Sequence, residues 1–180
     1  MAVKKQTKIL LIAVSIVLIF IFIQGFKKAN GPASELTILG QDIGEFSTID
    51  LAGGTVTNEV FSGFDVNMVY LWSTGWPSCI QELPELAKLE AEALENFGLV
   101  GILTDGQNKE TAARIVDQVG LKMPNILLNE ELYSSIQKVQ YIPYIYFVDS
   151  EGRAINVELT GKQDLAELKE AIQTAFKAIE

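Results

Sequence analysis

One apolar run near the N-terminus divides the chain into two parts that suit different solvents. Residues 9–26 read ILLIAVSIVLIFIFIQGF and contain no charged side chain. As a helix, this run would span about 27 Å, close to the roughly 30 Å hydrocarbon core of a bilayer. It is longer than the apolar part of a cleaved signal peptide, about 7–15 residues, and no small-x-small cleavage site follows it. We therefore expect an uncleaved single-span membrane anchor; a cleaved signal peptide and a buried core helix are the alternatives.

Lysines on either side of the apolar run set the expected orientation. Three lysines and the amino terminus precede the run, and two lysines follow it. Because the more positive flank stays in the cytoplasm, we expect a single-pass protein of the cell membrane with an extracytoplasmic C-terminal domain. The chain then divides into a cytoplasmic N-terminus (1–8), a transmembrane anchor (9–26), a Gly/Pro/Ser-type linker (27–39) and a folded domain (40–180).

The charge of the body of the chain excludes some classes of partner. Of 14 basic and 23 acidic side chains, five lysines and no acid lie in residues 1–33. Residues 34–180 therefore carry a net charge of −14. A body this acidic is repelled by phosphate backbones, so nucleic acid is excluded as a partner, and no polybasic surface is available for anionic lipid.

Apolar patterning beyond residue 40 predicts an α/β fold. Short apolar runs, typical of strands buried on both faces, alternate with amphipathic helical stretches. The predicted strands are a hairpin within 46–60 and single strands at 66–72, 99–104, 126–128, 144–148 and 154–159. The predicted helices are 77–97, 109–119, 130–139 and 162–179. This order indicates a mixed central sheet covered by helices on both faces.

Two residue counts exclude several kinds of catalysis. The chain has no histidine and one cysteine. Without histidine, it cannot form a Ser-His-Asp or Cys-His nucleophile, a histidine general base or a histidine-containing zinc site. A single cysteine excludes an internal disulfide and a dithiol–disulfide cycle within one molecule. We predict no metal and no cofactor.

Two segments resemble a known family. Residues 72–84, WSTGWPSCIQELP, resemble the active-site segment of membrane-anchored thioredoxin-like proteins of the TlpA/ResA type, which are redoxins with thiol-disulfide oxidoreductase activity. The positions in register are Trp72, Ser73, Thr74, Cys79, Glu82, Leu83 and Pro84. Tyr141-Ile142-Pro143, followed by YIYFVDSEG, resembles the segment that contains the family's cis-proline. Over residues 40–178 the resemblance implies a thioredoxin-like fold with an N-terminal β-hairpin extension.

The family's C-x-x-C motif is degenerate in this chain. It reads Trp76-Pro77-Ser78-Cys79, so Trp76 stands where the family has its exposed attacking cysteine. An indole cannot form a mixed disulfide, and the two-cysteine route is therefore closed to this chain. Whether the protein is an enzyme depends on what Cys79 can do alone.

Cys79 has two interpretations. It is either a small buried core thiol or a monothiol that forms a mixed disulfide, or a sulfenic acid, and is regenerated by an external thiol reductant. The predicted helix N-terminus favours a thiolate, and the charge of Glu82 opposes it. Glu82 is either the family's buried carboxylate near the sulfur or, as we favour from sequence, a first-turn acid that interacts with the helix dipole.

The remaining candidate residues suggest a binding groove. Trp76, Pro77, Ile142, Pro143 and Tyr144 are the predicted binding residues, and Trp76 beside Pro143 and Tyr144 suggests an exposed aromatic platform. The expected partner is an extended peptide or an exported protein. The leading hypothesis is a membrane-tethered, extracytoplasmic thioredoxin-like protein with at most monothiol activity. The alternative is a catalytically silent thioredoxin-like binding module for an exported protein or membrane complex.

Overall fold

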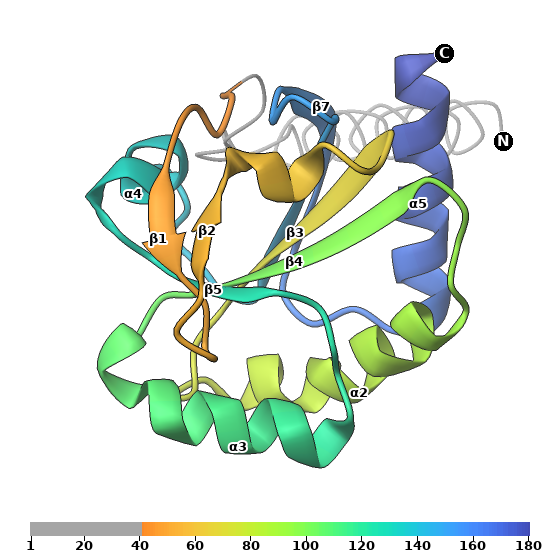
Figure 1. Ribbon diagram of the computed structural model, residues 1–180. Coiled ribbons are helices and arrows are strands. Elements are labelled where there is room, and N and C mark those ends of the chain that lie inside the picture. Colours follow the sequence, from red (N-terminus) through yellow and green to blue (C-terminus); the bar gives the residue numbers. More distant parts are fainter. Residues whose placement is uncertain (1–40) are drawn as a thin grey trace, which may run out of the picture. The chain divides into compact units, whose positions relative to one another are not determined.

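The computed structural model describes residues 41–180 (Figure 1). The predicted N-terminus (1–8), membrane anchor (9–26) and linker (27–39) lie outside the described residues. The predicted folded domain, 40–180, is described from residue 41 onward. Among residues 41–180, no helix is both long and apolar enough to cross a bilayer.

The described residues form two sheets. A small antiparallel sheet consists of β1 (Ser47–Ile49) and β2 (Thr55–Thr57), which confirms the predicted hairpin. The main sheet has the strand order β5-β4-β3-β6-β7. Its strands are β3 (Val66–Trp72), β4 (Phe97–Leu103), β5 (Asn125–Leu127), β6 (Tyr144–Val148) and β7 (Ala154–Thr160). The sheet is mixed, because β3, β4 and β5 are parallel while β6 is antiparallel to both β3 and β7.

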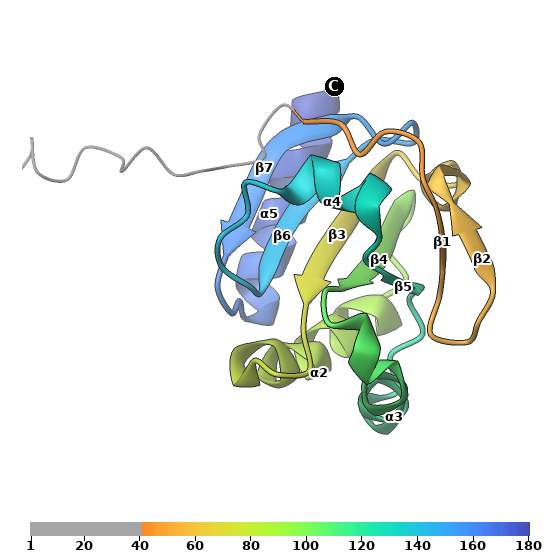
Figure 2. The same ribbon diagram turned by 90° about the vertical axis from the view of Figure 1, so that its left-hand side faces the viewer.

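Helices and the hairpin cover both faces of the main sheet (Figures 1 and 2). The helical elements are η1 (Asn58–Phe61), α2 (Pro77–Ala91), η2 (Gly106–Asn108), α3 (Lys109–Val119), α4 (Glu130–Ile136) and α5 (Leu165–Ile179). Apolar residues of α2, α3 and α5 pack on one face. The opposite face is covered by α4, η1 and the residues around β1. The predicted α/β sandwich is confirmed.

The central strand shows why the predicted apolar runs form strands. All seven residues of β3 are buried, and β3 pairs with β4 along its whole length. A strand enclosed by two neighbours and by packed layers on both faces needs apolar side chains at odd and even positions alike. The sequence VNMVYLW provides them, with Asn67 as the one exception.

Most predicted boundaries agree with the structure, and one is clearly wrong. The helix at Lys109–Val119 and the strand at Tyr144–Val148 have the predicted ends. The helix predicted to reach Phe97 ends at Ala91, because Ala93 and Asn96 adopt positive φ angles of 47° and 55° that no α-helix contains. Phe97 instead begins β4, although its spacing from α2 fits the apolar helical pattern.

A buried hydrogen bond joins β3 to β5 across a glycine. The indole N–H of Trp72 donates to Oδ1 of Asn125 at 3.0 Å, and the Asn125 amide donates to the carbonyl of Met123. Asn125 reaches this position over Gly101 of β4, where a Cβ would lie 2.3 Å from Oδ1. The absence of a side chain at Gly101 therefore lets the buried indole keep a partner.

We expect Gly101→Ala to lower the free energy of unfolding by about 2–3 kcal/mol, because the new methyl group overlaps Asn125 and displaces the acceptor of the Trp72 indole. Urea denaturation of the full-length chain, followed by tryptophan fluorescence, measures this loss. Gly63→Ala is the matched control, since a Cβ on Gly63 meets nothing within 4 Å. An equal loss in both variants would contradict the prediction.

Candidate functional site

The loop after β3 and the loop before β6 leave the sheet at the same end. Leu71 of β3 is paired with Tyr144 of β6, so Ser73–Trp76 continue from β3 beside residues 141–143. Figure 2 shows β3 ending and β6 beginning at this end of the sheet. The Ile142–Pro143 peptide bond is cis, as the resemblance implied. The two segments predicted to form one site therefore lie at one end of adjacent strands.

Cys79 lies in the first turn of α2 with its side chain in the core. Its exposed fraction is 0%, and the hydroxyl of Tyr70 donates to its carbonyl at 3.1 Å. Burial raises the pKa of the Cys79 thiol to about 11; the backbone of Ser73 opposes this rise, and Glu82 adds to it. At pH 7, only about one molecule in ten thousand then carries a thiolate. The helix N-terminus does not compensate for this burial.

Glu82 is buried in the same cluster. Its exposed fraction is 0%, and Oε1 accepts the backbone N–H of Gln163 at 3.0 Å. Within residues 41–180, Oε2 has no hydrogen-bond partner. Burial raises the pKa of Glu82 to about 7, while the Gln163 N–H and the Tyr70 hydroxyl favour the ionised form. The favoured interpretation of Glu82 as a first-turn acid is therefore wrong, because the carboxylate lies beyond that turn and faces the core.

Trp76 is exposed at the N-terminus of α2. It is the N-cap of α2, makes no side-chain capping bond and is 54% exposed. Tyr141, in the loop before Pro143, is 69% exposed. Trp76 and Tyr141 therefore both present aromatic surface to solvent at this end of the sheet. The exposure of Tyr141 was not predicted from the sequence.

Two of the three residues predicted to form the exposed platform, Pro143 and Tyr144, are buried. Tyr144 is only 3% exposed, because it begins β6 and is paired with Leu71 on one side and Thr160 on the other. Its hydroxyl bonds to Glu158. Pro143 is buried as well. The exposed aromatic residues at the site are therefore Trp76 and Tyr141.

The backbone next to Pro143 is available for pairing. The carbonyl of Pro143 accepts the N–H of Gly161 at 2.9 Å. The N–H and carbonyl of Ile142 make no hydrogen bond to any residue in 41–180. The side chain of Ile142 is half-buried, and Pro77 at the start of α2 is exposed. A chain lying between these residues could thus bond to the backbone of Ile142.

Asp105 fixes the loop that carries Trp76. Its carboxylate accepts the backbone N–H of Thr74 at 3.1 Å and the Thr74 hydroxyl at 2.6 Å. Burial is the largest single effect on Asp105 and raises its pKa, but the hydrogen bonds from Thr74 and Asn108 together outweigh burial, so the pKa is lowered. Sequence reasoning missed Asp105 and Tyr70. The position of Asp105, just after a strand parallel to β3, is the one signal that could have indicated its role.

No metal centre is evident at this site. Among residues 41–180, no group of three or more His, Cys, Asp or Glu side chains is arranged to hold a metal ion. The polar groups that the structure does bring together here are Tyr70, Glu82 and Cys79 in the core, and Thr74 with Asp105 at the surface.

Comparisons with known proteins identify the fold and not a family. No protein-family model and no curated protein matches this chain. Solved structures that resemble it include a thioredoxin-family thiol:disulfide interchange protein from Chlorobium tepidum, with a TM-score of 0.65 and 18% identity over 76% of this chain and 96% of that one.

Two further structures give the same result. The thioredoxin domain of a thiol-disulfide oxidoreductase from Bacteroides vulgatus has a TM-score of 0.60 and 22% identity over 76% of this chain and 96% of its own. StoA from Bacillus subtilis has a TM-score of 0.59 and 19% identity over 72% and 96%. Residues 41–180 therefore have the thioredoxin-like fold, with a mixed central sheet, as the resemblance implied.

Proposed function

We propose that this protein is a catalytically silent thioredoxin-like module that binds an extended segment of an exported protein. Two observations on neighbouring residues carry this proposal. An exposed indole, Trp76, stands where disulfide exchange would need an attacking thiolate, and the thiol of Cys79 is fully buried. Such a site retains a surface for a polypeptide and lacks a group that could exchange disulfides with it.

Burial and pKa count against the monothiol alternative. A nucleophilic cysteine needs a thiolate that its partner can reach. Cys79 has neither property, because its side chain has no exposed surface and its pKa is raised to about 11. Buried Glu82 adds a second obstacle, since any negative charge on its carboxylate opposes a thiolate on Cys79. The alternative that the sequence left open, a structural core thiol, thus has the stronger support.

The binding function rests on exposed aromatic surface beside unpaired backbone. Trp76 and Tyr141 offer large apolar contacts of the kind that dominate binding energy. Ile142 offers a donor and an acceptor without partners in residues 41–180. An extended peptide satisfies both, because its backbone bonds to Ile142 while its side chains pack on the two rings. The bonds of Thr74 to Asp105 hold the Trp76 loop ready for this contact.

The proposed place of action follows from residues 1–33. The uninterrupted apolar run and the lysine bias support a membrane tether with the domain outside the cytoplasm. A tethered domain meets exported chains at high local concentration, so even modest affinity at the Trp76 site is sufficient for function.

We expect Cys79 to react with a charged maleimide only when the domain unfolds. At pH 7 the native full-length chain labels slowly, the rate rises toward pH 9 as the thiolate fraction grows, and added urea makes labelling fast at either pH. Mass spectrometry of the labelled chain measures each rate. Rapid labelling of the native protein at pH 7, at the rate of a free thiol, would support the monothiol alternative instead.

Restoring the lost cysteine tests whether Trp76 is what silences the site. We expect Trp76→Cys to catalyse the reduction of insulin by dithiothreitol, because a thiol at the exposed N-cap can attack a disulfide and Cys79 can resolve the product. The native chain has no activity above background. The matched control is Trp76→Cys combined with Cys79→Ser, which leaves one cysteine and no resolving thiol. A native chain as fast as Trp76→Cys would refute the proposal.

The binding role of Trp76 has its own test. We expect Trp76→Ala to weaken binding of reduced, carbamidomethylated ribonuclease A, an unfolded chain without thiols, by roughly tenfold. Tyr133→Ala is the matched control, because Tyr133 is also an aromatic residue, 57% exposed, and lies on α4. Fluorescence anisotropy of the labelled client reports the affinity. Equal losses in the two variants, or no binding by the native chain, would contradict the proposal.

A further inference from the structure

The main sheet has an open edge halfway along β4. On one side β4 pairs with β3 from Phe97 to Leu103. On its other side β5 pairs only with Gly101–Leu103. The stretch 97–100 therefore has no strand neighbour on that side. The outer edge of β5, in contrast, is covered by the hairpin, through a bridge between Asp50 and Ile126 and a bond from the Thr48 hydroxyl to Leu127.

Pro124 and Lys122, which precede β5, explain why the ladder between β4 and β5 stops at Gly101. To extend it, residue 124 would have to donate its N–H to the carbonyl of Leu99, and Pro124 has no N–H. One step earlier, the N–H of Lys122 donates to the carboxylate of Glu90 on α2 at 2.7 Å. The chain that enters β5 is therefore bonded to α2 and leaves the edge of β4 free.

The N–H and carbonyl groups of successive residues in β4 point alternately toward β3 and toward the β5 side, and this alternation identifies the groups that face the open edge. The N–H of Gly101 donates to Pro124, and the carbonyl of Leu103 accepts from Leu128, so odd-numbered residues of β4 face the β5 side. Phe97 and Leu99 share this orientation. Their outward N–H and carbonyl groups make no hydrogen bond to any residue in 41–180. Such a row of unpaired groups is a template for another strand.

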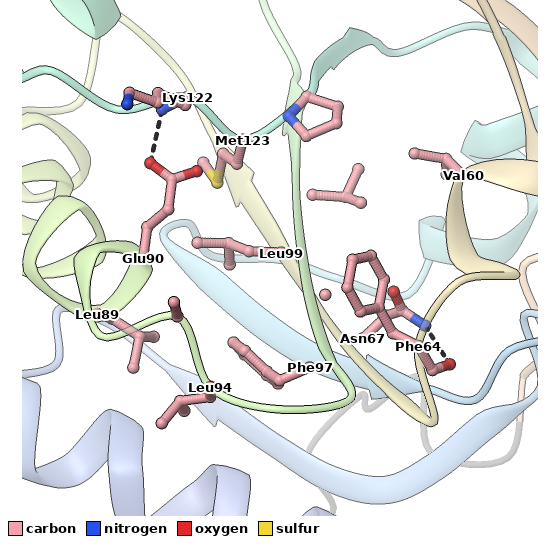
Figure 3. A pocket seen from close by; sticks show the side chains of 14 residues that line it. Val60, Phe64, Asn67, Leu89, Glu90, Leu94, Phe97, Leu99, Lys122 and Met123 are labelled. Carbon is pink, nitrogen blue, oxygen red and sulfur yellow. Dashed lines mark hydrogen bonds between the residues drawn. The ribbon is translucent and has the colours of Figure 1, made fainter.

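A pocket of about 330 Å³ surrounds this edge and extends to both faces of the sheet. Figure 3 shows β4 between two groups of lining side chains. On one side lie Leu89, Leu94 and Met123, and on the other lie Val60 and Phe64. Because successive side chains of an extended strand point to opposite faces, a strand added beside β4 would place alternate residues against these two groups.

The charges around the pocket are mostly negative. Glu90 and Lys122 line it, and Glu59, Asp65 and Glu95 each adjoin a lining residue in sequence and are exposed. Four of these five charged residues are acidic, so the charge beside the pocket is mostly negative. A basic segment complements this rim, and an acidic one is repelled by it.

We propose that the open edge of β4 binds an extended, basic peptide segment of another protein by strand addition. The segment would carry apolar residues at successive positions along the stretch that pairs with β4, because both faces beside this edge are apolar, and lysine or arginine on either side of that stretch. Main-chain bonds to Phe97 and Leu99 provide affinity, and the two apolar groups and the acidic rim select the sequence. This binding surface is separate from the Trp76 site, which lies beyond the C-terminal end of β3, and it does not depend on the function proposed for that site.

Hydrogen exchange with the full-length chain in detergent micelles tests this proposal. The probe is a short capped peptide with a central run of valines flanked by lysines. We expect the amides of Phe97 and Leu99 to exchange fast in the free protein and to be protected when the peptide is added, as measured by mass spectrometry, whereas the amides of residues 98 and 100 face β3 and stay protected in both states. A peptide of the same charge with proline in place of each valine cannot donate to the edge and gives no protection. A glutamate–valine peptide gives none either, because the rim repels it.

A pair of charge reversals separates local from overall electrostatics. We expect Glu95→Lys to weaken lysine–valine peptide binding about threefold to tenfold, because it reverses a charge on the rim. Glu170→Lys changes the net charge equally but lies exposed on α5, and it leaves the affinity unchanged. Equal effects of the two reversals would overturn the proposal.

Three exchange results would also overturn it. The first is no protection of the Phe97 and Leu99 amides at saturating peptide. The second is protection in the free protein at every concentration, which would mean that this chain's own N-terminal residues occupy the edge. The third is protection that grows with protein concentration, which would mean that a second copy occupies it.

Discussion

The pairing of β3 on both of its edges is the constraint on which the rest of the structure depends. Its register with β6 places Leu71 opposite Tyr144, and this single match brings the Trp76 loop beside Ile142 and Pro143. Its register with β4 brings Asp105 to the same end, where it binds Thr74. A slip of one residue in either ladder would turn the fully buried β3 side chains toward the wrong layers. The site geometry is thus a consequence of sheet register.

The core beneath the site buries three polar groups close together. Tyr70, Cys79 and Glu82 remain buried together, and Glu82 joins α2 to the loop before α5 through the N–H of Gln163. This bond gives the carboxyl group a structural role that does not require a reactive sulfur. Burying a polar group is unfavourable unless it is bonded. The Gln163 contact therefore offsets part of the cost of burying Glu82.

Sequence predicts what local patterning controls and misses what tertiary packing decides. The amphipathic period of 109–119 and the apolar run after Pro143 gave correct ends for α3 and β6. The end of α2 was missed, because Phe97 continues the helical pattern while positive φ angles at Ala93 and Asn96 turn the chain. The predicted site residues Trp76 and Pro143 lie at the same end of adjacent strands, but strand pairing buries Tyr144 and helix packing buries Glu82. Neither burial can be read from spacing alone.

The acidic charge of the domain bears on how an open strand edge can persist without self-association. An unpaired edge invites the same edge of a second molecule, and natural proteins block such pairing with charge, bulges or covering segments. Here the hairpin covers β5. Beside the exposed half of β4, Glu90 lines the pocket, and Glu59, Asp65 and Glu95 each adjoin a lining residue in sequence. Two copies meeting at this edge would bring these carboxylates together, and residues 34–180 carry a net charge of −14 in each copy. Like charge thus disfavours the homotypic pairing, while a basic strand gains from the same groups.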